Sequence, residues 1–339
     1  MRDFKLGIIV RADETGLGFQ TRDYYKHLKP DKTILIDLSP LNGNEQHYEW
    51  YENYMLVKGI PSMAQVDDML DGIDVLLTAE TPYNLELYKR ARERGVKTIC
   101  VENAEFYDHI KYPEYEMPDL IILPSVWHLD EIKNHAESRG TKFVQIHHPV
   151  DRELHPFKLR TGNRTMHTAG KPATYDRNGT WDYLYAVPNG TVITQDEGFA
   201  RQIRNRYSRS KVFTGIRDFT TMYSYGDIFV LPRKYGGNCL PLNEALSHGL
   251  PVIMPDISPN NNLLPKEWLV PATVTDWFEP RGRVDVYTVD FDALLKRIDW
   301  VAANIEEQSK IANEIADSIS WTTLLSKYEE AIRNIVHGG

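Results

Sequence analysis

Residues 225–254 read YGDIFVLPRKYGGNCLPLNEALSHGLPVIM, and this stretch decides the fold. The apolar run 228–231 predicts a buried strand, a loop with a Gly-Gly pair follows it, and residues 240–248 have the apolar spacing of a helix. A second apolar run, 252–254, predicts another strand. A strand, a glycine-rich loop, a helix and a strand in this order predict a βαβ unit with a parallel sheet.

The same alternation of short apolar runs with amphipathic stretches extends over the chain and predicts an α/β fold with two Rossmann-like halves. Strands of the first half are predicted at 6–10, 33–38, 75–78, 98–101, 120–123 and 143–146, with helices at 85–94 and 127–138. Strands of the second half are predicted at 192–194, 212–214, 228–231, 252–254 and 269–270, with helices at 199–207, 219–225 and 240–248.

Three regions follow from this pattern. Residues 148–164 are rich in Pro, Arg and His and lack a clear period, which is typical of a linker. We therefore expect an N-terminal Rossmann-like domain at 1–155 and a C-terminal one at 156–318. Residues 319–339 form a last helix that we expect to pack at the domain junction, because apolar side chains recur at helical spacing in it. These are Leu324, Leu325, Tyr328, Ile332 and Ile335.

Composition narrows the class of protein. The chain has 339 residues, of which 42% are hydrophobic and 26% charged, as in globular proteins of two domains. No apolar run approaches the roughly 20 residues that cross a bilayer, and residues 1–10 have no signal-peptide pattern. Cys100 and Cys239 are the two cysteines, and neither a disulfide framework nor a zinc site is indicated. We therefore expect a cytoplasmic protein without a membrane span or a bound metal.

Charge is unevenly distributed. The net charge is −9, yet residues 142–217 carry thirteen Lys or Arg against six Asp or Glu, so this stretch is +7 and the remainder −16. Such segregation favours an anionic ligand or polymer, because fixed positive charge raises the local concentration of phosphates. A solvated basic face explains it equally well.

The glycine-rich loop of residues 225–254 has the features of a phosphate site. Gly236 and Gly237 let the backbone approach a ligand, and the amides of 238–240 open a helix whose positive end favours phosphate. Asn238, Cys239 and Leu240 are therefore candidate donor-binding residues. Glu244, one turn further on, can accept hydrogen bonds from ribose hydroxyls. The alternative is that the glycines only make a turn.

In order and spacing, this stretch resembles the donor-site signature of glycosyltransferase family 4, in which a strand ending in Pro-Ser precedes Glu-Gly-Phe-Gly-Leu-Pro-Leu-Leu-Glu-Ala. The family's second glutamate, which holds the nucleotide ribose, falls on Glu244. Its first glutamate, placed against the transferred sugar, falls on Gly236, so the sugar and the way catalysis is assisted do not carry over. The resemblance implies a GT-B fold: two Rossmann-like domains face each other across a cleft, and the C-terminal helix crosses back to the N-terminal domain.

Further segments resemble the same family. Residues 167–171 and 177–179 resemble its Gly-Arg and Lys-Gly pair, whose cations clamp the diphosphate, which makes Gly170, Lys171 and Arg177 donor-site candidates. Lys171 and Arg177 are also catalytic candidates, because two cations neutralise the leaving diphosphate when no metal is present. Two exposed cations in a loop are the alternative. Gly215, after the strand 212–214, resembles the segment that flanks the nucleotide base.

The N-terminal segment 13–21 follows the first strand and resembles the family's glycine loop, which lies against the sugar and phosphates. Gly16, Leu17 and Gly18 are therefore donor-site candidates, with a helix expected at 22–28. A dinucleotide-binding fingerprint would need a third glycine, and Thr21 stands in its place, which disfavours an NAD enzyme.

Two acidic segments remain. After the strand 98–101, where the family often has a histidine facing the sugar, this chain has Glu102, a catalytic candidate that could orient the acceptor hydroxyl or stabilise charge at the anomeric carbon. A buried glutamate satisfied by backbone amides is the alternative. Asp290 and Asp292 imitate a metal-binding DxD motif, but they precede a helix at 293–301 and are better explained as an N-cap.

Together these features predict a retaining, metal-independent glycosyltransferase that needs no cofactor and uses a nucleoside diphosphate-sugar, a UDP-sugar first, as co-substrate. The N-terminal half is similar to glycosyltransferases encoded by tailed bacteriophages, which implies the host cytoplasm and an acceptor such as a hydroxymethylated base in phage DNA. A protein or a cell-surface glycan is an alternative acceptor. A sugar-nucleotide epimerase and an inactive nucleotide-sugar-binding module are alternative functions. The oligomeric state stays open.

Overall fold

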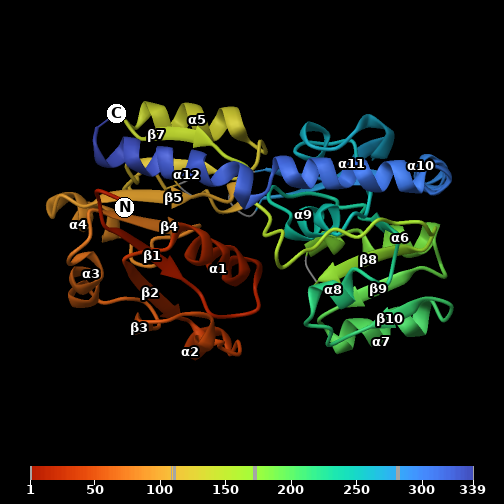
Figure 1. Cartoon of the computed structure of the whole chain (residues 1–339), viewed down its shortest axis with the longest axis horizontal. Coiled ribbons are helices and arrows are strands. Elements are labelled where there is room, and N and C mark those ends of the chain that lie inside the picture. Colours follow the sequence, from red (N-terminus) through yellow and green to blue (C-terminus); the bar gives the residue numbers. More distant parts are fainter. Residues whose placement is uncertain (1, 108, 110–111, 171–173, 280–282, 339) are drawn as a thin grey trace. The chain divides into compact units, whose positions relative to one another are not determined.

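The computed structural model describes residues 2–107, 109, 112–170, 174–279 and 283–338. The chain divides into two compact units, one formed by Met1–His148 with Leu324–Gly339 and the other by Pro149–Thr323. The chain passes from the first unit to the second between His148 and Pro149 and returns to the first at Leu324. Figure 1 shows the chain and labels many of the elements of both units.

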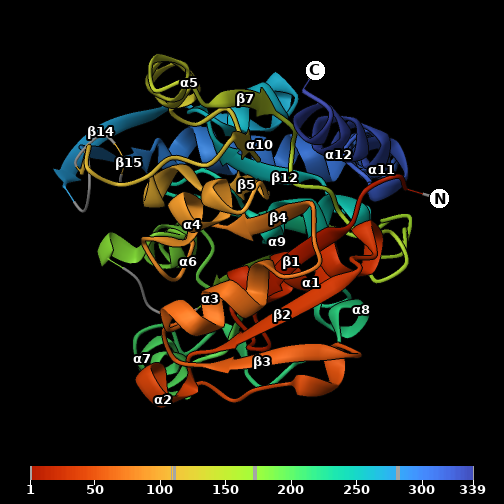
Figure 2. The same ribbon diagram turned by 90° about the vertical axis from the view of Figure 1, so that its left-hand side faces the viewer.

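The N-terminal unit is built on a seven-stranded sheet in the order β3-β2-β1-β4-β5-β6-β7, in which every neighbouring pair is parallel. Figure 2 follows this sheet from β3 at the bottom to β7 at the top. Its strands are β1 (Leu6–Val10), β2 (Lys32–Asp37), β3 (Tyr54–Lys58), β4 (Val75–Ala79), β5 (Lys97–Val101), β6 (Leu120–Leu123) and β7 (Lys142–Gln145). Its helices are α1 (Gly16–Leu28), α2 (Ser39–Asn42), α3 (Met63–Leu70), α4 (Leu87–Glu93), α5 (Leu129–Ser138) and, from Leu324 on, α12 (Trp321–Val336).

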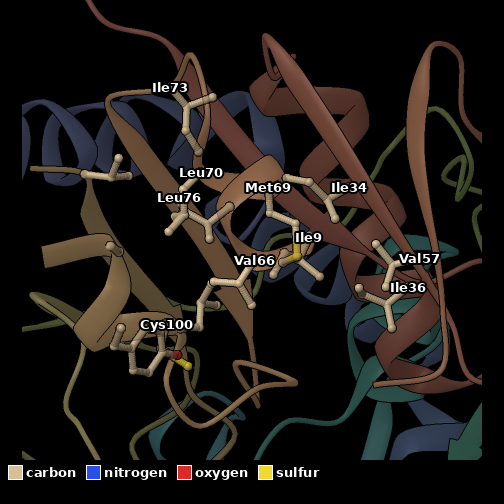
Figure 3. Packing of buried hydrophobic residues seen from close by; sticks show 14 residues of the cluster. Ile9, Ile34, Ile36, Val57, Val66, Met69, Leu70, Ile73, Leu76 and Cys100 are labelled. Atoms are coloured by element: carbon tan, nitrogen blue, oxygen red, sulfur yellow. The ribbon is translucent and has the colours of Figure 1, made fainter. Parts of the chain in front are cut away.

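Apolar side chains from helices and strands form the core of this unit (Figure 3). Val66, Met69 and Leu70 on α3 pack against Ile9 of β1 and Ile34 of β2, and all five are almost completely buried. Burial of each such side chain contributes about 1.5–3 kcal/mol, so this face of α3 accounts for its docking on the sheet.

The C-terminal unit is built on a six-stranded parallel sheet in the order β10-β9-β8-β11-β12-β13. An antiparallel two-stranded ribbon, β14 with β15, follows it along the chain. The strands are β8 (Thr165–Gly170), β9 (Thr191–Thr194), β10 (Lys211–Phe213), β11 (Ile228–Val230), β12 (Val252–Pro255), β13 (Leu269–Val270), β14 (Ala272–Phe278) and β15 (Val284–Val289). The helices are α6 (Thr180–Ala186), α7 (Glu197–Arg206), α8 (Phe219–Met222), α9 (Leu240–Ser247), α10 (Phe291–Ala303) and α11 (Ile305–Ser318).

The prediction of an α/β fold with two Rossmann-like halves is confirmed, and the β11, α9 and β12 elements follow each other as the glycine-rich segment predicts. The expected helix cap is also present, since the Asp290 carboxylate accepts a hydrogen bond of 2.9 Å from the Ala293 amide at the start of α10. Sequence reasoning missed β8, a central strand of the second sheet, because its residues TMHTAG form no apolar run.

One prediction about the N-terminal segment is wrong. Gly16, Leu17 and Gly18 do not form a loop ahead of a helix at 22–28, because α1 already begins at Gly16. Thr15 caps this helix, its hydroxyl accepting from the Gly18 amide at 3.1 Å. Gly18 is needed for packing, since a Cβ there would lie 1.9 Å from the Asp13 carbonyl oxygen.

Candidate active site

The topology of the C-terminal sheet marks one place for a ligand. Its strand order reverses between β8 and β11, and open parallel sheets bind ligands beyond the carboxyl ends of the strands at such a point. The segment after β8 carries Arg177, and the segment after β11 carries Arg233 and the two glycines. These two segments, 174–179 and 232–239, are called the β8 loop and the β11 loop below.

Two arginines from these loops converge on Gly236. A Cβ built on this glycine would lie 2.5 Å from an Arg177 Nη atom and 2.6 Å from an Arg233 Nη atom, and its φ of +116° suits only glycine. Arg233 is only 6% exposed, and it donates to the carbonyl oxygens of Tyr235 at 3.0 Å and Asn238 at 3.1 Å. Two guanidinium groups held side by side repel each other, so an anion between them is stabilised.

Close backbone contacts hold the two loops together. A Cβ on Gly179 would lie 2.0 Å from the Pro232 carbonyl oxygen, so only glycine permits this approach. The Lys234 amide donates to the Arg177 carbonyl oxygen at 2.8 Å, and the Lys234 ammonium pairs with Asp182 at 2.7 Å. These contacts join the two loops that carry Arg177 and Arg233.

Helix α9 adds a second anchor beside this anion site. The helix begins at Leu240, and the side chain of its N-cap residue, Cys239, makes no capping hydrogen bond. On the helix, Glu244 is half-buried, and its Oε2 accepts a hydrogen bond of 2.6 Å from the Tyr223 hydroxyl. Burial and the neighbouring Glu244 carboxylate raise the pKa of Tyr223 well above its usual value, so the hydroxyl stays protonated and orients the carboxylate.

A buried histidine fixes β8 against β11. His167 is fully buried, its Nδ1 lies 2.9 Å from the Val230 carbonyl oxygen, and its Nε2 lies 3.0 Å from the Thr180 hydroxyl. Because the carbonyl can only accept, Nδ1 carries the proton and Nε2 accepts from Thr180. Burial lowers the pKa of His167 to about 4, so the ring is neutral near pH 7.

The other predicted residues of this unit also lie at or beyond the carboxyl ends of strands of this sheet. Gly170 ends β8 with a φ of +65°, and Gly215 follows β10 with a φ of +69°. Gly237, Asn238, Cys239 and Leu240 run from the β11 loop into α9. Lys171 lies outside the described residues. Arg233 was missed by sequence reasoning, although its place directly after the strand-ending Leu-Pro pair is visible in the sequence.

In the N-terminal unit, Glu102 follows β5 and is 2% exposed. The Cys100 thiol donates to its Oε2 at 3.4 Å. This burial favours the structural alternative for Glu102, while its catalytic role stays a prediction. Gly16, Leu17 and Gly18 occupy the first turn of α1 in the same unit.

A second carboxylate, missed by sequence reasoning, lies at the switch point of the first sheet. Glu80 follows β4, is half-buried and has a φ of +62°, a conformation in which non-glycine residues are strained. Its Oε1 accepts from the Asn103 amide group at 2.5 Å, and that amide also donates to Gln20 at 3.1 Å. Among the described residues, Oδ1 of Asn103 is buried without a hydrogen-bond partner, so this site offers acceptors to a ligand hydroxyl.

Within the described ranges, no helix is long and apolar enough to cross a membrane, and no three His, Cys, Asp or Glu side chains are placed to hold a metal ion.

Solved structures with the same arrangement of elements were found. Sucrose-phosphate synthase from Thermosynechococcus elongatus has a TM-score of 0.70 at 14% identity, covering 99% of this chain and 100% of that chain. The chain has the GT-B fold. A glycosyltransferase from Rickettsia africae has a TM-score of 0.69 at 12% identity, covering 100% of both chains. HepE from Anabaena, in complex with UDP and glucose, has a TM-score of 0.67 at 10% identity, covering 97% of this chain and 99% of that chain.

Neither a protein-family model nor a curated protein sequence matches the chain. The similarity to the GT-B structures is one of structure, at low sequence identity, and it establishes the fold alone. The function must therefore be argued from the site.

Proposed function

We propose that this chain is a retaining glycosyltransferase that takes its sugar from a nucleoside diphosphate-sugar, with a UDP-sugar as the first candidate donor. The observation that carries the proposal is the convergence of Arg177 and Arg233 on Gly236 at the switch point of the C-terminal sheet. Two guanidinium groups match the charge of a diphosphate, and Glu244 lies on the helix that the same loop opens, where it can accept from ribose hydroxyls. HepE, a structure of similar fold, was solved with UDP and glucose.

In the proposed reaction, the oxygen of an acceptor hydroxyl forms a bond to the anomeric carbon of the donor sugar. The bond from that carbon to the diphosphate oxygen breaks, and the same oxygen takes the hydroxyl proton. Arg177, Arg233 and, by sequence resemblance, Lys171 neutralise the charge that develops on the diphosphate, so the reaction needs neither a metal nor a protein nucleophile. Attack from the side of the leaving group retains the configuration, and an inverted product would refute this part of the proposal.

For the acceptor side, two carboxylates compete. Glu102 is the sequence prediction, whereas Glu80 is more exposed and lies beside the unpaired oxygen of Asn103. Either could orient a hydroxyl. For the acceptor itself we propose a hydroxymethylated base in DNA, because residues 142–217 carry a charge of +7 and clustered positive charge favours a phosphate polymer. A mobility-shift assay with duplex DNA at low salt tests this, and absence of binding would leave protein or cell-surface glycan as acceptor.

The donor proposal is tested by thermal shift with UDP, GDP, ADP, their sugars and NAD, on the wild type and on Glu244→Ala. A ligand that binds only the folded state raises its melting temperature, by an amount set by its concentration relative to its Kd. We expect one nucleoside diphosphate to stabilise the wild type and to lose most of this effect in the variant. Stabilisation by NAD alone, or by no nucleotide, would refute the proposal.

The two rival functions give different products. An epimerase would convert the sugar of the donor without releasing the nucleoside diphosphate, and an inactive binding module would bind the donor without any turnover. Release of the nucleoside diphosphate from its sugar, whether the sugar goes to an acceptor or to water, therefore distinguishes a transferase from both.

A further inference from the structure

The β14–β15 ribbon follows the last strand of the C-terminal sheet, and its two strands differ in burial. In β15, Val284, Val286 and Val289 are buried and hold the ribbon on its unit. In β14, Trp277 is 52% exposed, whereas the next residue, Phe278, is half-buried. The ribbon therefore has an anchored strand and an outer strand that ends at a partly covered aromatic ring.

That ring touches both loops of the anion site. The Phe278 ring lies 5.0 Å from the ring of Tyr235, in the β11 loop, in a T-shaped arrangement. It lies 5.5 Å from the ring of Tyr175, in the β8 loop. Offset and T-shaped aromatic pairs at these distances are stabilising, so one side chain of the ribbon connects the two loops.

The contacts continue from the aromatic rings to Arg177. Its guanidinium carbon lies 5.6 Å from the centre of the Tyr235 ring, within the range of a cation–π interaction. The Tyr235 hydroxyl donates to the Thr174 carbonyl oxygen at 2.7 Å. The Tyr287 amide of β15 donates to the Lys234 carbonyl oxygen at 3.0 Å, so ribbon and β11 loop also share a backbone hydrogen bond.

The β8 loop needs such support because its backbone is strained. Tyr175 and Asp176, which directly precede Arg177, have φ values of +55° and +51°, and neither is glycine. Such a conformation is unfavourable for a non-glycine residue and persists only when its surroundings enforce it. The Asp176 carboxylate is held by the Trp181 amide at 2.8 Å, and the Tyr175 ring contacts Phe278.

We propose that the β14–β15 ribbon positions the arginines of the anion site and that Phe278 is its positioning residue. Without this ring the turn at Tyr175 and Asp176 can relax, and Tyr235 loses the contact that orients it against Arg177. The ribbon then governs the affinity for the diphosphate part of a ligand while leaving the binding of the nucleoside part unchanged. This inference rests on the proposed binding of a nucleoside diphosphate.

The test is calorimetric titration of UDP and of uridine into the full-length wild type, Phe278→Ala and the control Trp277→Ala. Trp277 lies on the same strand and is exposed. The guanidinium carbon of Arg283 lies 5.4 Å from the centre of its ring. We expect Phe278→Ala to bind UDP about tenfold more weakly, a loss of the size that aromatic contacts give. Uridine binding and the Trp277→Ala variant should be unchanged, and Phe278→Tyr, which keeps the ring, should restore the affinity for UDP.

A double-mutant cycle separates positioning from general destabilisation. If Phe278 acts through Arg177, Phe278→Ala should weaken UDP binding little further once Arg177 is already alanine. Equal losses for UDP and uridine, full additivity with Arg177→Ala, or wild-type affinity in Phe278→Ala would each overturn the proposal. If Phe278→Ala does not fold, Phe278→Leu is measured in its place against the same criteria. Failure of the wild type to bind any nucleoside diphosphate would refute the proposed function as well, whereas wild-type binding with an unaffected Phe278 variant refutes this inference alone.

Discussion

Replacement of Gly236 by alanine tests the anion site at its centre. The new methyl group would lie 2.5 Å and 2.6 Å from guanidinium nitrogens of Arg177 and Arg233, so both side chains must move away. The residue must also keep a φ of +116°, which costs an alanine about 1–3 kcal/mol. The variant should therefore lose both stability and anion affinity.

A control variant separates the effect of backbone strain from the effect of crowding the two arginines. A matched control is Gly95→Ala, because Gly95 has a φ of +73° and no atom lies within 4 Å of the position that its Cβ would take, so it reports backbone strain without crowding. In Gly236→Ala, Arg233 also gives up hydrogen bonds to Tyr235 and Asn238 when it shifts. Each charge-assisted contact to a phosphate contributes about 1.5–3 kcal/mol, so losing one raises the Kd for UDP by about tenfold or more.

Calorimetric titration of UDP measures the affinity, and urea denaturation of both variants measures the stability. We expect the control to bind UDP as the wild type does and Gly236→Ala to bind at least about tenfold more weakly. The reasoning fails if Gly236→Ala binds UDP within about twofold of the wild type and is no less stable than Gly95→Ala.

Four further outcomes are expected. Tyr223→Phe should weaken UDP binding by about three- to tenfold in titration, because Glu244 loses the hydroxyl that orients it, and unchanged binding would contradict that role. His167 has a folded-state pKa of about 4, below its unfolded value. The difference corresponds to roughly 3 kcal/mol of stability, which is present above about pH 6.5 and is lost as the pH falls toward 4. In urea denaturation, the midpoint of His167→Asn should therefore depend less on pH than that of the wild type. Asp290→Ala should lower the stability by about 1 kcal/mol in urea denaturation through loss of the α10 cap, and a neutral effect would mean that the cap is dispensable. Glu80→Gln should slow the release of UDP from a UDP-sugar by on the order of 100-fold, whereas Glu102→Gln should stay near the wild-type rate, and the opposite ranking would restore Glu102.

The fold was predictable where apolar runs are continuous. Strands β1, β6 and β11 are buried along their whole length, and their sequences contain no polar side chain. Strand β8 is buried too, but His167 and Thr168 supply polar side chains there, and His167 is satisfied by groups on β11 and α6 that are distant in sequence. Such a strand cannot be recognised from hydrophobicity, because its partners are known only once the chain is folded.

The site was predictable in part, for a similar reason. The glycines and Glu244 are candidates because they match a pattern, and Arg177 is a candidate through its spacing from Lys171. Arg233 matches no such pattern, and only the structure shows that it is buried and lies close to Gly236. The position of the Glu80 side chain depends on a positive backbone φ, which glutamate rarely adopts. The sequence therefore does not predict it.

At Gly236 this chain differs from the resembled family by having positive charge in place of a carboxylate. Where the resembled family has a carboxylate, this chain has a backbone conformation reserved for glycine, and the space that a side chain would take is filled by guanidinium nitrogens of Arg177 and Arg233. A glutamate at this position would have to adopt a φ of +116° and would pair with the same two arginines, removing the positive charge that a diphosphate requires. Gly236 and the two arginines are therefore interdependent, because the family's glutamate at this position would neutralise both arginines and weaken the anion site.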